Sequence, residues 1–246
     1  MNPGSEPLPT PAATLARARV LVVGLGGLGS PVAAALANAG VGTLGLIDPD
    51  VVELSNLHRQ LLYDLGDVGL PKSAVAAARL RARTPPVRIR TWRERFTPAH
   101  TALLATFDLV VDGTDTIAAK FVTNDAAVAT GVPLVHAGVL GWQAQLLTIL
   151  PGQSPCYRCL FEEAPPEGDV PTCTDAGVLG PVATLAGALQ AAEALRVLLG
   201  TGAAFAGRVL TIDVRAGTWR TVPFHRNPRC AVCARTPAER PRSHAP

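Results

Sequence analysis

Charge is scarce in this sequence, and what there is does not gather in one place. Charged residues make up 17% of the 246 positions, the formal net charge is +3, and no strongly basic run precedes the C-terminal tail. Proteins that bind nucleic acid normally present a concentrated basic patch. The composition therefore gives no indication of a nucleic-acid partner, whereas it permits an acidic protein partner.

Long uncharged hydrophobic runs are also missing. The longest apolar stretch, residues 177–200, includes Gln190, Glu193 and Arg196, which favours a core helix over a membrane span. The N-terminus has neither the basic nor the apolar region of a signal peptide, and its Pro, Ser and Gly content predicts a disordered lead-in over residues 1–15. We therefore expect a cytoplasmic protein with no membrane partner.

What is present is a strand, a glycine turn, a helix, a second strand and an acid between Val20 and Asp50. The run RVLVVG is typical of a strand buried on both faces. Gly24, Gly26 and Gly29 follow in G-x-G-x-x-G spacing, which permits a tight turn, close approach of a phosphate, and close packing of helix on strand. The positive end of the helix would then face that phosphate.

The second strand ends in an acid about 20 residues beyond the glycines, a position that suits binding of ribose hydroxyls. This arrangement predicts a nucleotide site. Its candidate residues are Gly24, Gly26, Gly27, Gly29, Asp48 and Asp50. At this point NAD, FAD, S-adenosylmethionine and ATP all fit, and the choice depends on the residues that follow.

Two cations after the second strand favour ATP. Asn56 and Arg59 are three residues apart in a short helix predicted around residues 56–62, so they share a face. Lys72 lies in the first turn of a helix predicted over residues 71–83, with the proline at the first helical position. A cation there opposes the helix dipole, which indicates an anion nearby.

The run DGTD supplies a second acid, Asp115, at the end of another predicted strand. Together with the cations, an acid at a strand end suits a triphosphate with Mg²⁺ better than a dinucleotide. Asp112 of the same run is expected to satisfy loop amides. His136, which ends a later predicted strand, is expected to be packed and neutral.

Strands and helices alternate through the first part of the chain, the pattern of a doubly wound sheet. We predict an α/β, Rossmann-like fold with a mainly parallel sheet and a C-terminal antiparallel hairpin that turns at Ala-Gly. A single domain is expected over residues 16–234, with a crossover loop at about 161–178. A flexible tail is expected at 235–246.

Four of the five cysteines form two C-x-x-C pairs, which in a cytoplasmic protein favour a metal over disulfides. Four thiolates make a tetrahedral structural Zn²⁺ site with no open position for catalysis. The predicted zinc ligands are Cys156, Cys159, Cys230 and Cys233. The fifth, Cys173, lies just before a long helix predicted over residues 179–199, where a thiol's pKa is lowered.

Seven motifs occur in order between Arg19 and Cys233: GLGGLGS, DPDVVELSNLHRQLLY, GLPKS, DGTD, CYRCL, AGVLGP and NPRCAVC. Together they resemble the MoeB/ThiF/HesA family, the prokaryotic relatives of ubiquitin-activating enzymes. SNLHRQ closely resembles that family's S-N-L-x-R-Q signature. The resemblance implies an ATP-dependent adenylyltransferase that acts on the C-terminal Gly-Gly carboxylate of a small ubiquitin-like sulfur-carrier protein.

Carried over residue by residue, the resemblance implies that Asp48 binds the ATP ribose and that Asp115 holds Mg²⁺. Asn56, Arg59 and Lys72 would meet the phosphates. The resemblance also supports the structural zinc. A carboxylate nucleophile is already ionised, so the reaction needs charge neutralisation and alignment rather than a general base.

The family's crossover loop often carries a cysteine, which leaves two alternatives for Cys173. It either takes part covalently in sulfur transfer, or it is a bystander while a cysteine desulfurase or rhodanese delivers sulfur to the acyl-adenylate. The resemblance also implies a homodimer, in which an N-terminal R-Y-x-R-Q-like motif supplies an arginine to the partner's ATP site. This sequence has no such motif, and Arg17 and Arg19 are the arginines nearest to its place.

Three other functions stay open. An NAD-dependent oxidoreductase would leave the Arg59, Lys72 and Asp115 set without a use. A non-catalytic, zinc-stabilised module would bind a ubiquitin-like tail without turnover. An enzyme that adenylates a carboxylate on modified tRNA fits poorly with the weak basic balance. The sequence does not distinguish molybdopterin, thiamine or another sulfur-transfer pathway.

Overall fold

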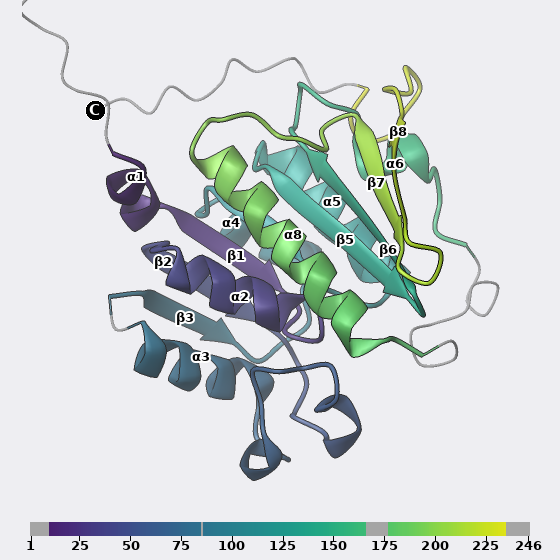
Figure 1. Cartoon of the computed structure of the whole chain (residues 1–246). Helices are drawn as coiled ribbons and strands as arrows, with labels where there is room; N and C mark the ends of the chain where they lie inside the picture. Colours follow the sequence, from purple (N-terminus) through teal and green to yellow (C-terminus); the bar gives the residue numbers. More distant parts are fainter. Residues whose placement is uncertain (1–9, 85, 166–176, 235–246) are drawn as a thin grey trace, which may run out of the picture.

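One eight-stranded sheet, in the order β3-β2-β1-β4-β5-β6-β7-β8, runs through the computed structural model, which describes residues 10–84, 86–165 and 177–234 (Figure 1). The strands are β1 Arg19–Val23, β2 Thr43–Ile47, β3 Arg88–Trp92, β4 Leu109–Asp112, β5 Leu134–Leu140, β6 Gln143–Ile149, β7 Arg208–Asp213 and β8 Thr218–Pro223. The α-helices are α1 Pro11–Arg17, α2 Gly29–Asn38, α3 Lys72–Arg83, α4 Thr101–Leu104, α5 Ile117–Thr130, α6 Tyr157–Leu160 and α8 Gly180–Leu198. Three short 3₁₀ helices are η1 Leu54–Asn56, η2 Leu65–Asp67 and η3 Pro98–His100.

The sheet has a parallel part and an antiparallel part. Strands β3, β2, β1, β4 and β5 pair in parallel, whereas β6, β7 and β8 continue the sheet in antiparallel pairing. The parallel order reverses between β1 and β4, and ligands of such sheets bind in the crevice outside the carboxyl ends of the strands at this point. The predicted Rossmann-like fold with its C-terminal hairpin is confirmed, and the crevice position predicts where a nucleotide would bind.

Both faces of the sheet are covered, as the apolar strands require. In β1, Val20 and Val22 belong to the core beneath α2, α3 and α8, while Leu21 and Val23 belong to the core beneath α4, α5 and α6. Successive side chains of a strand point to opposite faces, so a strand between two helical layers must be apolar throughout. Figure 1 shows α2 and α8 side by side on the near face, with α4 and α5 behind the sheet.

The structure differs from the expected lead-in over residues 1–15, because α1 begins within it. The Thr10 side chain accepts a hydrogen bond from the Ala13 amide, Pro11 occupies the first turn, and Leu15 is buried. A capped start and one apolar anchor are sufficient to dock this short helix. Residues 1–9 lie outside the described part of the chain.

The helix predicted around residues 56–62 is also wrong. Only η1 and a series of turns occupy this region, and Val52 pairs with Leu70 and Gly69 through backbone hydrogen bonds. The segment between Val52 and Gly69 therefore forms a loop whose two ends are joined by backbone hydrogen bonds. The second helix, α3, is confirmed, except that Pro71 is its N-cap and not its first residue.

No helix among the described residues is long and apolar enough to cross a membrane.

Candidate nucleotide site and zinc centre

The turn between β1 and α2 needs glycine for two separate reasons. Gly24 has φ +84°, a left-handed conformation, and a Cβ there would come within 2.9 Å of the Gly113 backbone. A Cβ on Gly29 would lie 1.8 Å from the Gly24 carbonyl oxygen. The turn is therefore packed directly against the end of β4. No side chain caps the start of α2, so backbone N–H groups at its N-terminus remain available to an anion.

Asp48 joins this turn to the end of β2. Its Oδ2 accepts a hydrogen bond from the Leu25 amide at 2.7 Å and its Oδ1 accepts one from the Asp50 amide at 2.8 Å. Burial raises the pKa of the Asp48 carboxyl, and the nearby charge of Lys72 partly offsets that rise. Each carboxylate oxygen has more than one acceptor position, so Asp48 retains the capacity to bind a hydroxyl.

Lys72, the first residue of α3, points back toward the same strand end. Its side chain is 6% exposed, and Nζ lies 3.0 Å from Oδ2 of Asp50, whose own side chain is 59% exposed. The Lys72 amide also donates to the Asp50 carbonyl oxygen at 3.0 Å. Among the described residues, this buried ammonium thus has one carboxylate in ion-pair distance, which faces water and leaves the cation able to meet a second anion.

The SNLHRQ segment covers the glycine turn. Arg59 Nη2 donates to Asn56 Oδ1 at 2.6 Å, so these two side chains are held together although the segment is not an α-helix. A Cβ on Gly27 would lie 3.5 Å from Arg59 Cγ, and a Cβ on Gly180, at the start of α8, would lie 2.5 Å from the His58 carbonyl oxygen. Arg59 is therefore sandwiched between the turn and the N-terminal end of α8.

Asp115 reaches the site from the other side of the turn. It follows Gly113 and Thr114, whose backbone atoms lie within 3.1 Å of the position that a Cβ on Gly24 would take. Its side chain is exposed. Within the described part of the chain, no hydrogen bond or ion pair holds the Asp115 carboxylate, so it remains free to bind a cation.

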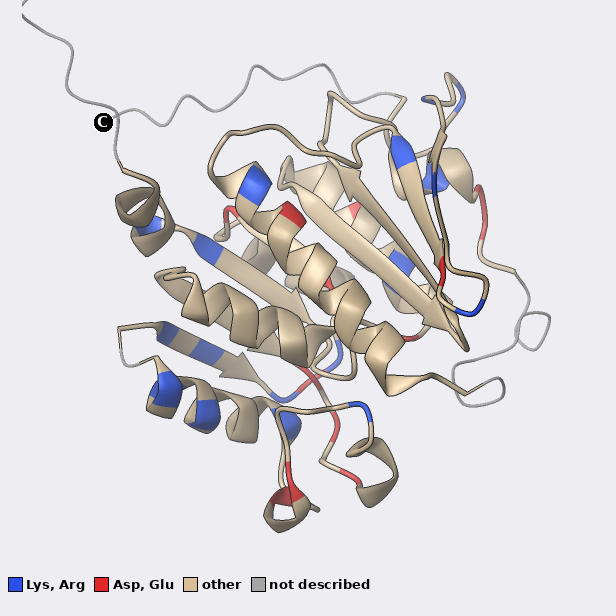
Figure 2. Cartoon of the chain, viewed as in Figure 1, with Lys and Arg blue, Asp and Glu red and all other residues tan. Residues whose placement is uncertain are grey.

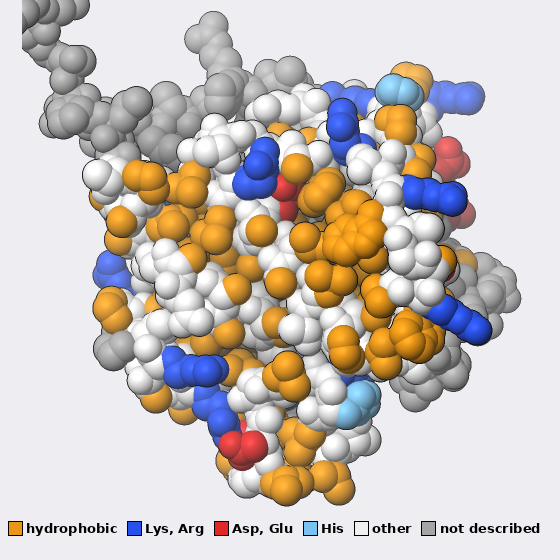
Figure 3. Space-filling view, viewed as in Figure 1, with side chains coloured by type: hydrophobic (Ala, Val, Ile, Leu, Met, Phe, Trp, Pro, Cys, Tyr) orange, Lys and Arg blue, Asp and Glu red, His pale blue; other side chains and the backbone are white. Residues whose placement is uncertain are grey.

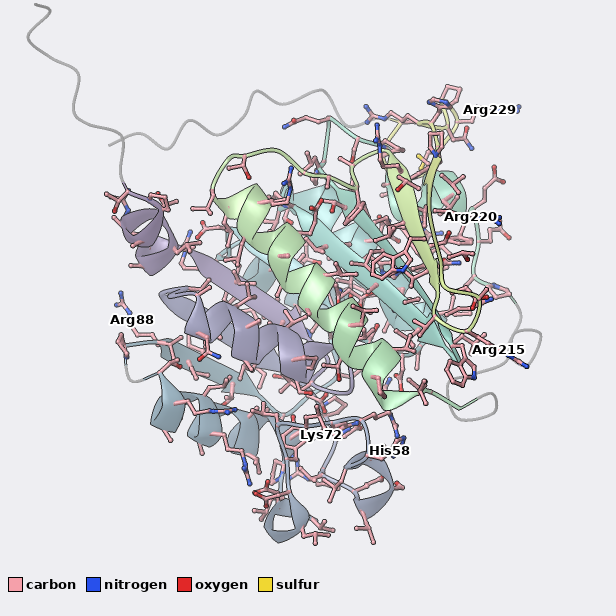
Figure 4. The ribbon with its side chains drawn as sticks, viewed as in Figure 1. His58, Lys72, Arg88, Arg215, Arg220 and Arg229 are labelled. Carbon is pink, nitrogen blue, oxygen red and sulfur yellow. The ribbon has the colours of Figure 1, made fainter. Side chains whose placement is uncertain are left out.

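The predicted nucleotide-site residues are thus brought together around one turn, at the switch point between β1 and β4. Figure 4 shows Lys72 and His58 at the edge toward which β1 and β3 point, whereas Arg88, Arg215, Arg220 and Arg229 lie elsewhere on the molecule. These four arginines therefore do not add charge to this site.

A buried polar network beneath the site was not predicted from the sequence. Asp112 is fully buried and accepts hydrogen bonds from His136 Nδ1 at 2.7 Å and from the Thr114 hydroxyl at 2.6 Å. Burial works against ionisation, but the Lys120 ammonium and the His136 contact outweigh it and hold the pKa of Asp112 well below its usual range. Burial and the Lys120 charge together lower the pKa of His136, as expected for a packed, neutral histidine.

The four predicted zinc ligands also come together. Their sulfur atoms all lie within 4.8 Å of one another, with Cys156 and Cys230 at 3.6 Å and Cys159 and Cys233 at 3.4 Å. A tetrahedral site with Zn–S bonds of about 2.3 Å separates its sulfurs by about 3.8 Å, so the set fits Zn²⁺. The site joins α6 to the segment after β8.

Two predicted features did not become part of the described site. Cys173 lies outside the described residues. Arg19, considered as a substitute for the missing N-terminal arginine motif, forms an ion pair with Asp108 at 2.8 Å beside the start of β1. This contact fixes Arg19 at the end of β1 opposite to the glycine turn.

The comparisons with known proteins agree with this geometry. The ThiF family model matches residues 9–232. The sulfur carrier protein adenylyltransferase of Thermus thermophilus is 46% identical over 232 residues, 92% of this chain and 86% of that protein. The SAMP-activating enzyme E1 of Haloferax volcanii is 43% identical over 220 residues, 89% of this chain and 81% of that protein.

Among solved structures, E. coli MccB with ATP is similar with a TM-score of 0.81, over 91% of this chain and 69% of that chain. At 24% identity this likeness supports the fold alone. The family model, in contrast, extends over most of the sequence, from α1 through the second C-x-x-C pair. The chain belongs to the ThiF family, as its motifs predicted.

Proposed function

We propose that this protein uses ATP to adenylate the C-terminal carboxylate of a small ubiquitin-like sulfur-carrier protein that ends in Gly-Gly. The observation that carries the proposal is the grouping of Arg59, Lys72 and Asp115 around a glycine turn at the start of a helix. A dinucleotide site needs only the turn and the ribose acid. The name of the similar protein from Thermus thermophilus, a sulfur carrier protein adenylyltransferase, supports a sulfur carrier as the substrate.

Each site residue has a proposed role that follows from its contacts. The backbone amides at the start of α2 bind phosphate, and Asp48 binds the ribose. Asn56 orients Arg59, which with Lys72 neutralises phosphate charge as the carrier carboxylate attacks the α-phosphorus and pyrophosphate leaves. Because the nucleophile is already ionised, positioning and charge neutralisation provide the catalysis.

Asp115 is the proposed Mg²⁺ ligand. Its exposed carboxylate, with no partner among the described residues, fits a hard cation that prefers one or two carboxylates together with phosphate oxygens. When bound, Mg²⁺ would neutralise charge on the departing pyrophosphate. The zinc centre has no open position and its proposed role is to hold the C-terminal segment against α6.

The product of the proposed reaction provides the test. The protein is mixed with ATP, Mg²⁺ and a recombinant ubiquitin-like carrier ending in Gly-Gly, and the carrier is examined by mass spectrometry for an added AMP group. The same carrier without its last glycine is the control. An adduct on the intact carrier alone supports the proposal, whereas tight binding of the intact carrier without an adduct would favour the non-catalytic module.

We further propose that Cys173 acts after adenylation, in sulfur transfer. Cys173→Ser should leave pyrophosphate–ATP exchange within a few-fold of the parent, because exchange uses only the nucleotide site. Formation of the carrier thiocarboxylate should be lost. If the thiocarboxylate forms normally in the variant, Cys173 is a bystander, and a cysteine desulfurase or rhodanese supplies sulfur directly to the acyl-adenylate.

A homodimer is proposed on the face formed by α2 and α8. Helix α2 has no charged residue, and Figure 2 shows charge on α8 only toward its C-terminal end. Figure 3 shows hydrophobic side chains spread over this face. A groove of about 300 Å³ between α2, Leu61 and Thr184 lies on it. Ala34→Arg on α2 should produce a monomer in light scattering, while Ala102→Arg on the opposite face should not.

The cytoplasm is the proposed location, because ATP supply and four free thiols available to bind zinc both fit a reducing compartment.

A further inference from the structure

We propose that Lys120 is a positioning residue: its buried ammonium clamps the peptide that precedes Asp115 and so sets the direction of the proposed Mg²⁺ ligand. The inference rests on the proposed function, since it concerns how Asp115 meets Mg²⁺ and ATP. Lys120 was not singled out by the sequence, because it lies inside α5 with no motif around it.

The contacts of Lys120 are unusual for a lysine. Its side chain is 9% exposed, and Nζ donates to the Thr114 carbonyl oxygen at 2.7 Å and to the Ala137 carbonyl oxygen at 2.8 Å. It also lies 3.5 Å from Asp112 Oδ2. One ammonium thereby ties the loop after β4 to strand β5 and to a buried carboxylate.

The clamped carbonyl belongs to the same planar peptide as the Asp115 amide. Fixing the Thr114 oxygen therefore fixes the orientation of that whole peptide unit, from which the Asp115 side chain departs. On the other side, Thr116 caps α5, its hydroxyl accepting from the Ala119 amide at 3.4 Å. Asp115 is thus held by its backbone on both sides while its carboxylate stays unpartnered.

The rest of the network makes the clamp rigid. Asp112 accepts hydrogen bonds from the Thr114 amide at 2.9 Å and from His136 at 2.7 Å. Gln190 of α8 donates to the Asp112 carbonyl oxygen at 2.8 Å. The loop that carries Asp115 is consequently tied to β5, α5 and α8, and it cannot shift without breaking buried polar contacts.

A direct role of Lys120 in phosphate binding is less consistent with these contacts. An ammonium has three donors, and Lys120 directs them to two carbonyls and a carboxylate, all inside the protein. Lys72, by comparison, has one exposed carboxylate as its side-chain partner. We therefore assign Lys72 to binding of the nucleotide and Lys120 to holding the loop that carries Asp115.

The test is binding of ATP measured by calorimetry at a series of Mg²⁺ concentrations. Asp115→Asn serves as the reference for a lost ligand. We expect K120M to raise the Mg²⁺ concentration for half-maximal ATP binding by about tenfold, the cost typical of disturbing the support of a metal ligand. K120R, which keeps the charge and the donors, should stay within about threefold of the parent.

Glu193→Gln is the matched structural control. Glu193 is also buried on a helix, and its Oε1 accepts from the Thr148 hydroxyl at 2.8 Å and from the Phe205 amide at 2.9 Å, away from the loop. E193Q should lower thermal stability without changing the Mg²⁺ dependence. If K120M does not fold, T114A is used in its place, because it removes the hydroxyl contact to Asp112. T114A should also raise the Mg²⁺ concentration for half-maximal ATP binding, by a smaller factor.

The outcomes distinguish a failure of the positioning role of Lys120 from a failure of the proposed Mg²⁺ ligand. If Asp115→Asn shifts the Mg²⁺ dependence and K120M does not, the positioning role is wrong and the proposed function stands. If Asp115→Asn has no effect, the assignment of Mg²⁺ to Asp115 fails, and the role of Lys120 fails with it. If the Mg²⁺ dependence shifts equally in E193Q and in K120M, lost stability alone explains the effect. That result would overturn the inference.

Discussion

Two cations on α3 illustrate why position matters more than charge at the residue scale. Lys72 is buried beside the glycine turn, whereas Arg79, two turns later, pairs with Asp64 and Asp67 away from it. Both cations have carboxylate partners, so charge alone does not distinguish them. The structure assigns them to different surroundings, and this gives a matched pair of variants.

Lys72→Ala should reduce pyrophosphate–ATP exchange by about a hundredfold, because a cation that stabilises developing phosphate charge is lost. Arg79→Ala should remain close to the parent exchange rate, because Arg79 pairs with carboxylates away from the glycine turn. Its partly exposed ion pairs also contribute little to the stability of the fold. Initial exchange rates at saturating ATP provide the measurement. Equal losses in both variants would contradict a specific role for Lys72.

The buried carboxylate of Asp112 gives a prediction for pH. Its pKa lies below the value of about 3.9 in the unfolded chain, so the ionised form stabilises the fold above about pH 4, and this contribution is lost as the pH falls further. Asp112→Asn removes it and leaves Lys120 without its carboxylate, at a cost of about 3 kcal/mol at pH 7.

Urea unfolding of the parent and of Asp112→Asn between pH 7 and pH 3 tests the direction of this pH dependence. The difference in free energy of unfolding should be constant near neutrality and should shrink below about pH 4. A gap that stays constant or widens at low pH would show that the Asp112 carboxylate is not the stabilising form.

The residues of the nucleotide site could be predicted from sequence because short motifs carry them, and their grouping follows from strand ends that meet at one edge. Lys120 could not be, because two of its three partners are backbone carbonyls, of the loop after β4 and of β5, which leave no sequence signal. The roles of Arg59, Lys72 and Asp115 stay predictions until they are measured.

At the scale of elements, the buried strands were predictable from short, continuous apolar runs, and the longer helices from longer apolar segments bounded by glycine or proline. The segment between β2 and α3 was not. Its Asn56 and Arg59 do lie together, but Asn56 ends η1 and Arg59 lies in the turn that follows, in a segment whose ends are joined by the pairing of Val52 with Leu70. Helix α1 was missed because Pro11, at its start, also fits a disordered segment.

The turn between β1 and α2 predicts a sharp difference between two glycine substitutions. Gly29→Ala would place a Cβ 1.8 Å from the Gly24 carbonyl oxygen and should destabilise the fold by more than about 4 kcal/mol. Gly138→Ala in β5 meets no atom within 4 Å and should cost less than about 1 kcal/mol. Thermal unfolding of both variants measures this, and similar melting temperatures would contradict the close packing.

The zinc centre predicts how the C-terminal segment depends on metal. One Zn²⁺ per chain is expected, and Cys230→Ser should lose it, because thiolate ligation contributes folding free energy directly. The segment after β8 should then become sensitive to limited proteolysis while the β1–β5 half stays protected. Metal analysis of protein purified without chelators gives the check, and an absence of zinc there would rule the site out.

At the scale of the whole molecule, the fold class, the family and the adenylyltransferase class were all predicted from ordered motifs and are confirmed. The motifs follow one another along the chain, so their order alone identifies the architecture. What the chain cannot encode is the identity of its carrier, because that protein contributes its own surface and tail.

Pyrophosphate–ATP exchange tests the central claim most directly. In the presence of Mg²⁺ and a carrier ending in Gly-Gly, the protein should transfer labelled pyrophosphate into ATP, and Asp115→Ala should reduce the rate by several orders of magnitude. Carrier without the terminal glycine should give no exchange. A protein that binds NAD tightly, fails to bind ATP and shows no exchange with any Gly-Gly carrier would contradict the account.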